Sequence, residues 1–147
     1  MTTTTTTTEY RKFLPEGIPD SQLPFWESLK AKAVKVQRCD DCGAYLYIPK
    51  DICSKCYSTQ LTWTPISGHG EVYTYTIVRR APTPAYQDEA PYVLAHVTMD
   101  EGFRMIAKLN TAAPEDVRIG MPVRITYEDV TPEWTLMFFE PAPAATG

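Results

Sequence analysis

Four cysteines provide the clearest chemical signal in this chain of 147 residues. They form two C-x-x-C pairs, Cys39 with Cys42 and Cys53 with Cys56. Two residues between the cysteines of a pair allow both sulfurs to reach one metal ion at about 2.3 Å. We therefore predict one tetrahedral site of four thiolates, with zinc as the metal and a single iron ion as the competing occupant.

This site is predicted to be structural and to hold one Zn²⁺ per chain. Four protein ligands leave no coordination position for a water molecule or a substrate. A disulfide framework is the weaker explanation, because all four cysteines fall within residues 39–56 instead of being spread over the chain. A chain of this length also buries a core large enough to be stable without disulfides.

Independent catalysis is not expected, and we assign no catalytic residue. The sequence contains two histidines, His69 and His96, and no cysteine outside the metal set. Neither histidine has a carboxylate neighbour at a spacing typical of a catalytic triad. The acidic pairs fall mostly at turns, where solvated loop charges are the ordinary interpretation.

The elements around the cysteines divide the chain into five parts. We expect a flexible N-terminal segment over 1–19, which includes a threonine run, and a helix over 20–35. The helix starts at Asp20 and Ser21, with Pro24 in its first turn. A zinc ribbon over 36–61, a barrel over 62–140 and a flexible tail over 141–147 complete the predicted organisation.

The barrel is predicted from strand-like segments that alternate or are rich in β-branched and aromatic residues. These segments are residues 70–78, 92–98, 103–109, 122–130 and 134–139. Five strands match an oligonucleotide/oligosaccharide-binding (OB) fold. The predicted fold class is therefore mainly β, with an N-terminal helix, a rubredoxin-like zinc ribbon and a C-terminal five-stranded OB-fold barrel.

Charge argues against nucleic acid as the partner, although zinc ribbons and OB folds often bind it. The net charge is −4. Residues 1–60 carry eight basic and seven acidic side chains, whereas residues 61–147 carry six basic and eleven acidic ones. A barrel with a net charge of −5 repels a phosphate backbone. Nucleic-acid binding is kept as the alternative function.

We expect a cytoplasmic location and no association with a membrane. The longest purely apolar stretch near either end is only Leu136–Phe139, far shorter than a membrane span. The N-terminus has neither the basic nor the apolar region of a secretion signal. A reducing compartment also agrees with cysteines kept as thiolates.

Several short motifs occur in an order that resembles one family. They are Pro24-Phe25-Trp26, Gln37-Arg38-Cys39, residues 68–76, Asp100-Glu101-Gly102 and residues 119–123. With the two cysteine pairs, they make the chain similar to the zinc-ribbon/OB-fold acyl-CoA-associated proteins, formerly a domain of unknown function. The resemblance covers about residues 15–141.

The resemblance implies a non-catalytic accessory subunit of a thiolase-superfamily complex. The thiolase-like partner would carry the catalytic residues, in a hetero-oligomer expected to be 2:2. The substrate would be an acyl-CoA, cleaved by thiolysis or retro-aldol chemistry in aromatic, steroid or lipid degradation. This subunit would help to bind coenzyme A and shape the active-site entrance.

Candidate contacts to coenzyme A follow from what that ligand requires, namely cations for its phosphates and an apolar slot for pantetheine. The candidate cations are Arg38, Lys50, Lys55, Arg79 and Arg80. Two alternatives stay open. The ribbon cations could merely neutralise the thiolates, and the apolar stretch between the knuckles could merely pack ribbon on barrel. That stretch contains Tyr45, Tyr47, Ile48 and Pro49.

Contacts to the partner are expected from the loop Ala81–Pro91, with Pro84 and Tyr86 directed toward the acyl pocket. A plain solvent loop is the alternative. Exposed aromatic residues would supply more of the interface unless they belong to the core. The candidates are Phe25, Trp26, Tyr86 and Trp134.

Overall fold

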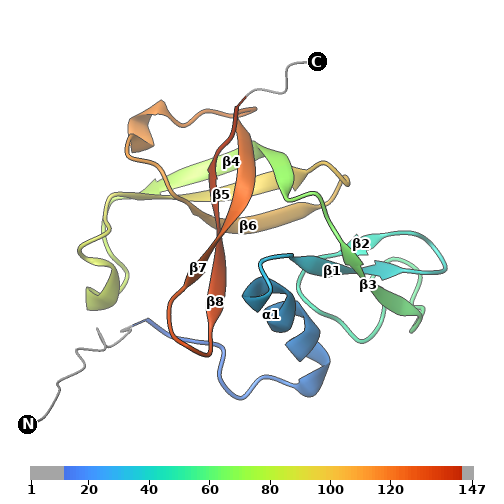
Figure 1. Ribbon diagram of the computed structural model, residues 1–147. Coiled ribbons are helices and arrows are strands. Elements are labelled where there is room, and N and C mark those ends of the chain that lie inside the picture. The colour runs from blue at the N-terminus through green and yellow to red at the C-terminus, as the bar shows by residue number, and fades with distance from the viewer. Residues whose placement is uncertain (1–11, 144–147) are drawn as a thin grey trace, which may run out of the picture.

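The structure is a computed structural model that describes residues 12–143, and it is mainly β with one α-helix (Figure 1). A three-stranded sheet lies beside a closed five-stranded barrel, and the helix packs between them. The predicted fold class is confirmed. Most of the threonine-rich N-terminal segment and the end of the predicted tail lie outside the described residues.

The ribbon sheet has the strand order β2-β1-β3 and is antiparallel throughout. Its strands are β1 (Lys35–Cys39), β2 (Tyr45–Leu46) and β3 (Leu61–Pro65). Strand β3 was not predicted; it pairs with all of β1, from Lys35 opposite Pro65 to Cys39 opposite Leu61. Thus the ribbon sheet extends a few residues past the predicted boundary at 61 before the chain enters the barrel.

The barrel has the strand order β4-β5-β6-β8-β7 and is closed by pairing of β4 with β7. Its strands are β4 (His69–Val78), β5 (Tyr92–Met99), β6 (Arg104–Leu109), β7 (Pro122–Asp129) and β8 (Thr135–Pro141). Short 3-10 turns η2 (Pro84–Tyr86) and η3 (Pro114–Asp116) lie in its connections. All five predicted strands are present, within two residues of the expected ends.

Alternation along the strands separates the barrel core from its outer wall. On β5 the side chains of Val93, Ala95 and Val97 are buried, while their neighbours are only half-buried. Phe139 of β8 is also fully buried in this core. Gly70 is the second residue of β4, and a Cβ there would lie 2.5 Å from the carbonyl oxygen of Thr98, so no larger residue fits.

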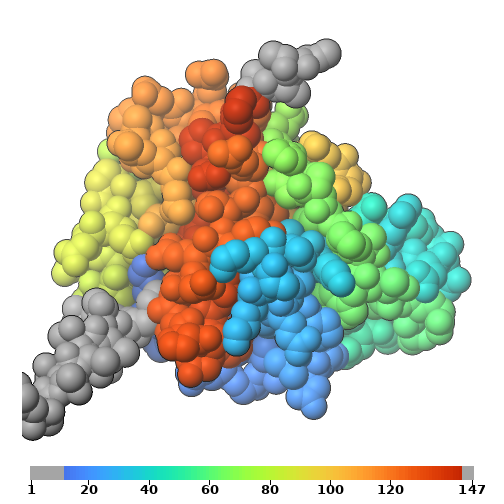
Figure 2. Space-filling view, in the orientation of Figure 1, coloured from blue at the N-terminus to red at the C-terminus, as the bar shows by residue number. Residues whose placement is uncertain are grey.

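The helix connects ribbon and barrel (Figure 2). A 3-10 turn η1 (Asp20–Gln22) leads into α1 (Leu23–Lys30), where Phe25 and Leu29 are buried. The helix ends earlier than the predicted boundary at 35, because Lys32 adopts a left-handed conformation with φ 57°. Within residues 12–143, no helix is long and apolar enough to cross a membrane.

Candidate metal centre and adjoining groove

The structure brings the four cysteines of the ribbon together. Their sulfur atoms all lie within 4.8 Å of one another. The Sγ atoms of Cys39 and Cys56 are 3.5 Å apart, and those of Cys42 and Cys53 are 3.7 Å apart. A tetrahedral zinc site with bonds of about 2.3 Å has sulfur–sulfur edges of about 3.8 Å. The four thiols therefore have the spacing that one zinc ion requires.

Two turns of the same form hold the cysteine pairs. The N–H of Gly43 donates to the carbonyl of Cys39 at 2.9 Å, and the N–H of Tyr57 donates to that of Cys53 at 2.9 Å. Both donor residues have a positive φ, 76° and 64°. Glycine adopts this conformation without strain, but a tyrosine does not. The second turn is thus built on a less favourable residue than the first.

Backbone donors around the sulfurs favour the thiolate form. The N–H of Cys42 lowers the pKa of the Cys39 thiol and outweighs burial, which acts to raise it. Burial also acts to raise the pKa of Cys53, but the N–H groups of Cys56 and Lys55 contribute to bringing it down to about 7. Thiolates are the form that binds metal.

The Ala44 N–H acts to lower the pKa of Cys42, but burial and the Cys53 and Cys39 thiols outweigh it and raise that pKa. The Ser58 N–H acts to lower the pKa of Cys56, but the Cys39 thiol, burial and the other two thiols raise that pKa to about 12. The thiolate is therefore favoured at Cys39 and Cys53, whereas the neighbouring thiols oppose it at Cys42 and Cys56.

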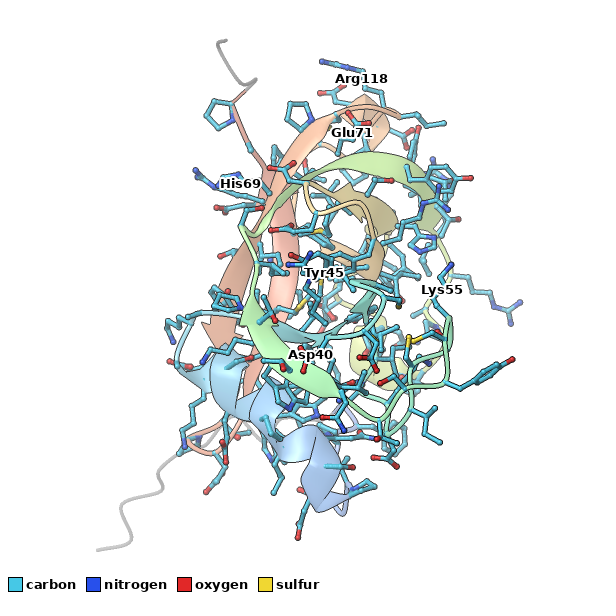
Figure 3. All side chains as sticks on the ribbon, turned by 90° about the vertical axis from the view of Figure 1, so that its right-hand side faces the viewer. Asp40, Tyr45, Lys55, His69, Glu71 and Arg118 are labelled. Carbon is cyan, nitrogen blue, oxygen red and sulfur yellow. The ribbon has the colours of Figure 1, made fainter. Side chains whose placement is uncertain are left out.

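A groove of about 650 Å³ lies where the ribbon meets the β5–β6 turn of the barrel. We call it the ribbon–barrel groove. Figure 3 shows Tyr45 between ribbon and barrel, and Lys55 at the outer edge of the ribbon. The groove is lined by Arg38, Gly43, Ala44, Tyr45, Lys55, Glu101, Gly102, Phe103 and Arg104.

Aromatic rings and guanidinium groups are ordered in this groove. The rings of Tyr45 and Phe103 stack, with centroids 5.5 Å apart and planes inclined by 15°. The Arg38 guanidinium lies 4.9 Å above the Tyr45 ring, and its Nε donates to the Gly43 carbonyl at 3.3 Å. The Arg104 guanidinium lies 3.6 Å from the centroid of Tyr73. Arg38 thus lies against the stacked pair, whereas Arg104 lines the groove with its guanidinium on Tyr73, which does not line it.

Two of the predicted coenzyme A cations, Arg38 and Lys55, line the groove, whereas Lys50, Arg79 and Arg80 do not. Lys50 instead fixes the loop through its main chain, with its N–H donating to Gln37 Oε1 at 2.6 Å. Arg79 pairs with Glu115 of η3 at 2.6 Å. Sequence reasoning missed Arg104, which comes from a strand whose outward positions are set only by the barrel register.

The apolar stretch between the cysteine pairs has two structural roles. Tyr47 packs with Phe25 at a centroid distance of 6.2 Å, and its hydroxyl donates to the Ile106 carbonyl at 3.4 Å. Burial raises the pKa of Tyr47. Tyr47 therefore joins ribbon to barrel, as the alternative interpretation required, whereas Tyr45 faces the groove. Pro49 is half-buried and does not line the groove.

The residues predicted to contact the partner differ in how far they are exposed. Phe25 is buried with 6% exposure, so it belongs to the core, which is the alternative that the sequence left open for these aromatic residues. Trp26 packs edge-on against Phe25 and Trp134. In the Ala81–Pro91 loop, Pro84 is exposed, but Tyr86 turns back onto the barrel and contacts Tyr92 at 5.7 Å.

Three large apolar side chains are exposed on the ribbon, and of these only Ile48 was a candidate from the sequence, as part of the pantetheine slot. Ile52 is half exposed, and Ile48 and Tyr57 are 60% and 81% exposed. Ile48 also has a positive φ of 67°, which is rare for a β-branched residue. Hydropathy alone could not identify these positions, because it predicts such residues to be buried.

This combination of a four-cysteine ribbon and a closed five-stranded barrel defines a zinc-ribbon/OB-fold protein. Residues 26–62 match the family described as "ChsH2, rubredoxin-like zinc ribbon domain". Residues 63–128 match the family described as "ChsH2, C-terminal OB-fold domain". The chain belongs to the DUF35 family, of the ChsH2 type, and the resemblance noted in the sequence is confirmed.

Relatives of this chain differ widely in length. It is 35% identical over 107 residues to a DUF35 domain-containing scaffold protein of Methanocaldococcus jannaschii, covering 71% of this chain and 75% of that protein. It is 37% identical over 119 residues to a probable enoyl-CoA hydratase alpha subunit of Thermomonospora curvata. That match covers 80% of this chain but only 37% of the subunit, so the chain spans well under half of that relative.

A solved structure and a further relative carry the names of an aldolase and of a thiolase subunit. The structure of an Ltp2-ChsH2(DUF35) aldolase matches with a TM-score of 0.76 and 33% identity, covering 86% of this chain and 98% of the matched chain. Benzoylsuccinyl-CoA thiolase subunit BbsA of Geobacter metallireducens is 29% identical over 76 residues, covering 52% of this chain and 49% of that subunit.

Proposed function

We propose that this chain is a non-catalytic subunit of a thiolase-superfamily complex that acts on an acyl-CoA. It binds one structural zinc ion, contributes to coenzyme A binding and shapes the entrance to the partner's active site. The cleaved bond is a carbon–carbon bond, broken by thiolysis or retro-aldol chemistry. The assembly is a hetero-oligomer, for which we propose two copies of each chain.

The observation that carries the coenzyme A assignment is the composition of the ribbon–barrel groove. Coenzyme A has an adenine ring, which stacks on aromatic faces, and phosphates, which pair with arginine and lysine. The groove offers the stacked Tyr45–Phe103 pair together with Arg38, Lys55 and Arg104. One carboxylate, Glu101, opposes them, and it accepts the Ser67 N–H at 2.7 Å. The groove therefore suits an aromatic polyanion.

Zinc supports this groove from the ribbon side. The ligands would be Cys39, Cys42, Cys53 and Cys56, and when bound the ion supplies a cross-link with no open coordination position. Arg38 directly precedes the first ligand on β1, and Lys55 lies inside the second cysteine pair. Metal binding therefore fixes the positions of two groove cations. Elemental analysis should find one zinc per chain.

Catalysis by a partner is consistent with the histidines of this chain. His69 is exposed, and His96 makes an edge-on contact with Tyr73 at 6.1 Å. Neither histidine lines the ribbon–barrel groove. The relatives with enzyme names are described as subunits, and the name of the matched aldolase joins Ltp2 with ChsH2. A thiolase-like partner would supply the reacting groups.

The exposed apolar side chains of the ribbon, Ile48, Ile52 and Tyr57, are the proposed contacts for this partner. All three belong to the ribbon, and an exposed apolar patch is typical of interfaces. Pro84 remains a candidate at the loop, while Tyr86 is turned toward the barrel.

Titration of the zinc-loaded chain with coenzyme A tests the groove. Replacing a phosphate-binding cation removes a charge-assisted hydrogen bond, so Lys55→Met should weaken binding by about tenfold. Arg79→Met is the matched control, because Arg79 pairs with Glu115 away from the groove, and it should bind like the wild type. Equal affinities of wild type and Lys55→Met, or an equal loss in both variants, would remove the groove assignment.

A further inference from the structure

Each exposed cysteine of the ribbon has a buried cysteine of the other pair as a close sulfur neighbour. Cys42 and Cys56 are exposed, whereas Cys39 and Cys53 are 1% and 0% exposed. The Sγ of Cys56 lies 3.5 Å from that of Cys39, and the Sγ of Cys42 lies 3.7 Å from that of Cys53. We call these two the cross-pair contacts, because both join the first cysteine pair to the second.

This arrangement has the parts of an oxidant-sensitive thiol site. Such a site combines an accessible thiolate, which reacts with the oxidant, and a second cysteine close enough to resolve the sulfenic acid that forms. Metal ligation keeps cysteines as thiolates. Cys42 and Cys56 are the accessible sulfurs, and Cys53 and Cys39 lie next to them as resolving sulfurs. The ribbon therefore contains the arrangement twice.

Only a small movement separates each cross-pair contact from a covalent bond. A disulfide has a sulfur–sulfur distance of about 2.05 Å, so each contact must shorten by about 1.5 Å. The buried members are held by their main chains, since the Cys39 N–H donates to the Ala44 carbonyl at 2.9 Å and the Cys53 N–H donates to the Ser58 carbonyl at 2.8 Å. The exposed members lie in turns at the surface and make the movement.

Cross-pair bonds differ in their consequence from bonds within the C-x-x-C pairs. Spacing alone favours a bond within each pair, as in C-x-x-C redox motifs. Bonds of that kind would leave the two turns of the ribbon unlinked once the metal is lost. A Cys39–Cys56 bond encloses a Cys42–Cys53 bond in the sequence, and together they link the two turns as the metal does.

We propose that Cys39–Cys56 and Cys42–Cys53 are reversible disulfide sites, through which a hydroperoxide converts the zinc-binding ribbon into a metal-free, cross-linked ribbon. The proposal concerns only the sulfurs. It does not depend on the coenzyme A function, and either could hold without the other.

The chemistry balances with peroxide as the oxidant. The exposed thiolate attacks one peroxide oxygen, the O–O bond breaks, and the leaving hydroxide takes up a proton to become water. The buried thiolate then attacks the sulfenic sulfur, the S–O bond breaks, and a second water forms. Two peroxide molecules and four protons thus convert four thiolates into two disulfides and four waters, and the sulfurs release Zn²⁺. Four electrons pass from sulfur to peroxide.

Oxidation of the zinc-loaded full chain with hydrogen peroxide tests the proposal. A chromogenic chelator measures the zinc that is released, and intact mass spectrometry measures the state of the sulfurs. We expect release of all bound zinc and a mass lower by four hydrogen atoms than that of the reduced, metal-free chain. Dithiothreitol with added zinc should restore the metal content, because thiol–disulfide exchange reverses the bonds.

Peptide mapping without reduction determines which sulfurs are joined. Cleavage after lysine and before aspartate places each cysteine on its own peptide, namely residues 36–39, 41–50, 51–55 and 56–87. We expect 36–39 bonded to 56–87, and 41–50 bonded to 51–55. Dimedone, which traps sulfenic acids, should label 41–50 and 56–87 at low peroxide, because these peptides carry the exposed sulfurs.

Two variants separate the two bonds. Cys42→Ser removes one exposed sulfur, so it should still form the Cys39–Cys56 bond and leave Cys53 reduced. Ser54→Ala is the matched control, because Ser54 lies inside the second cysteine pair without a sulfur, and it should give the wild-type bonds and zinc release.

Four results would overturn the proposal. They are retention of zinc in excess peroxide, sulfinic or sulfonic acids in place of disulfides, bonds within the C-x-x-C pairs, and failure of dithiothreitol with zinc to restore metal binding. All four are measured on the wild type, so they decide the question even if Cys42→Ser fails to fold.

Discussion

Gly43 and Tyr57 occupy the same position after the two cysteine pairs. Both have a positive φ, and both donate their N–H to the first cysteine of their pair. Only the glycine is suited to this conformation. Tyr57 is also 81% exposed, so no packing within the described residues explains the choice of a large side chain. Backbone strain of this kind tends to occur at functional positions.

Two replacements of Tyr57 should therefore distinguish the effect of backbone strain on stability from the effect of losing the tyrosine side chain. Tyr57→Gly relieves the left-handed conformation, so the zinc-loaded protein should be about 1 kcal/mol more stable to denaturant than Tyr57→Ala, which retains the strain. Gly43→Ala should lower the free energy of unfolding by a similar amount, because alanine is strained at this positive φ. No steric clash adds to that strain, since the nearest atom to the new Cβ would be Arg38 Nη2 at 3.7 Å. Equal stability of Tyr57→Gly and Tyr57→Ala would show that φ is not the cause.

Sequence alone identified the residues whose chemistry depends on local spacing. The cysteines form a site because two C-x-x-C pairs determine their geometry locally. Arg104 could not be identified this way, because it lies 66 residues from Arg38 and only the barrel register brings it to the same groove. Tyr86 was expected to face a partner, but the exposure of a loop side chain depends on the surface beneath it.

Among the elements, α1 joins the two parts of the molecule. Phe25, Leu29 and Val34 form one cluster that contacts Trp63 of the ribbon and Tyr127 of the barrel. The Tyr127 hydroxyl accepts the Val34 N–H at 3.0 Å. Helical spacing predicted the buried face, but it could not predict the early end at Lys30. Similarly, β3 is short, and its pairing with β1, which the sequence does not show, defines it as a strand.

Truncation of Leu29 should reveal this joining role. The side chain is 1% exposed, so Leu29→Ala should lower the free energy of unfolding by about 2–5 kcal/mol. Lys30→Ala, on the exposed side of the same helix, should change it by less than about 0.5 kcal/mol. Denaturant unfolding followed by tryptophan fluorescence measures both. A loss below 1 kcal/mol for Leu29→Ala would contradict the assigned packing.

Glu89 joins the Ala81–Pro91 loop to β6 through an ion pair with Lys108, and this ion pair depends on pH. Burial acts to raise the pKa of Glu89, but the ammonium groups of Lys108 and Lys12 outweigh it and lower the pKa below the ordinary value of 4.5. A lowered folded-state pKa stabilises the protein above the ordinary value. That stabilisation is lost as the pH falls through the folded-state pKa.

Glu89→Gln should therefore remove a pH-dependent contribution. Its melting temperature should be lower than that of the wild type at pH 6, and the difference should shrink as the pH falls below 4.5. Both proteins lose metal in acid alike, so the difference between them isolates Glu89. A difference that stays constant from pH 6 to acid would contradict the ion-pair assignment. Scanning calorimetry over this range provides the measurement.

At the scale of the whole molecule, the ribbon and the barrel contribute different groups to the proposed function. The ribbon carries the metal site, two groove cations and the exposed apolar residues Ile48, Ile52 and Tyr57. The barrel carries most of the negative charge of the chain, and it supplies Phe103 and Arg104 to the groove. Family membership is established by sequence and fold together, whereas the choice of partner and substrate depends on groups that another chain would provide.

The most direct test of the accessory-subunit account is a kinetic comparison with a purified thiolase-like partner. The kcat/KM for acyl-CoA cleavage is measured for the partner alone, with the wild-type chain, and with Lys55→Met or Arg79→Met. The account predicts low activity of the partner alone, restoration by the wild type and by Arg79→Met, and a raised KM with Lys55→Met. A partner that is fully active and stable without this chain would contradict it.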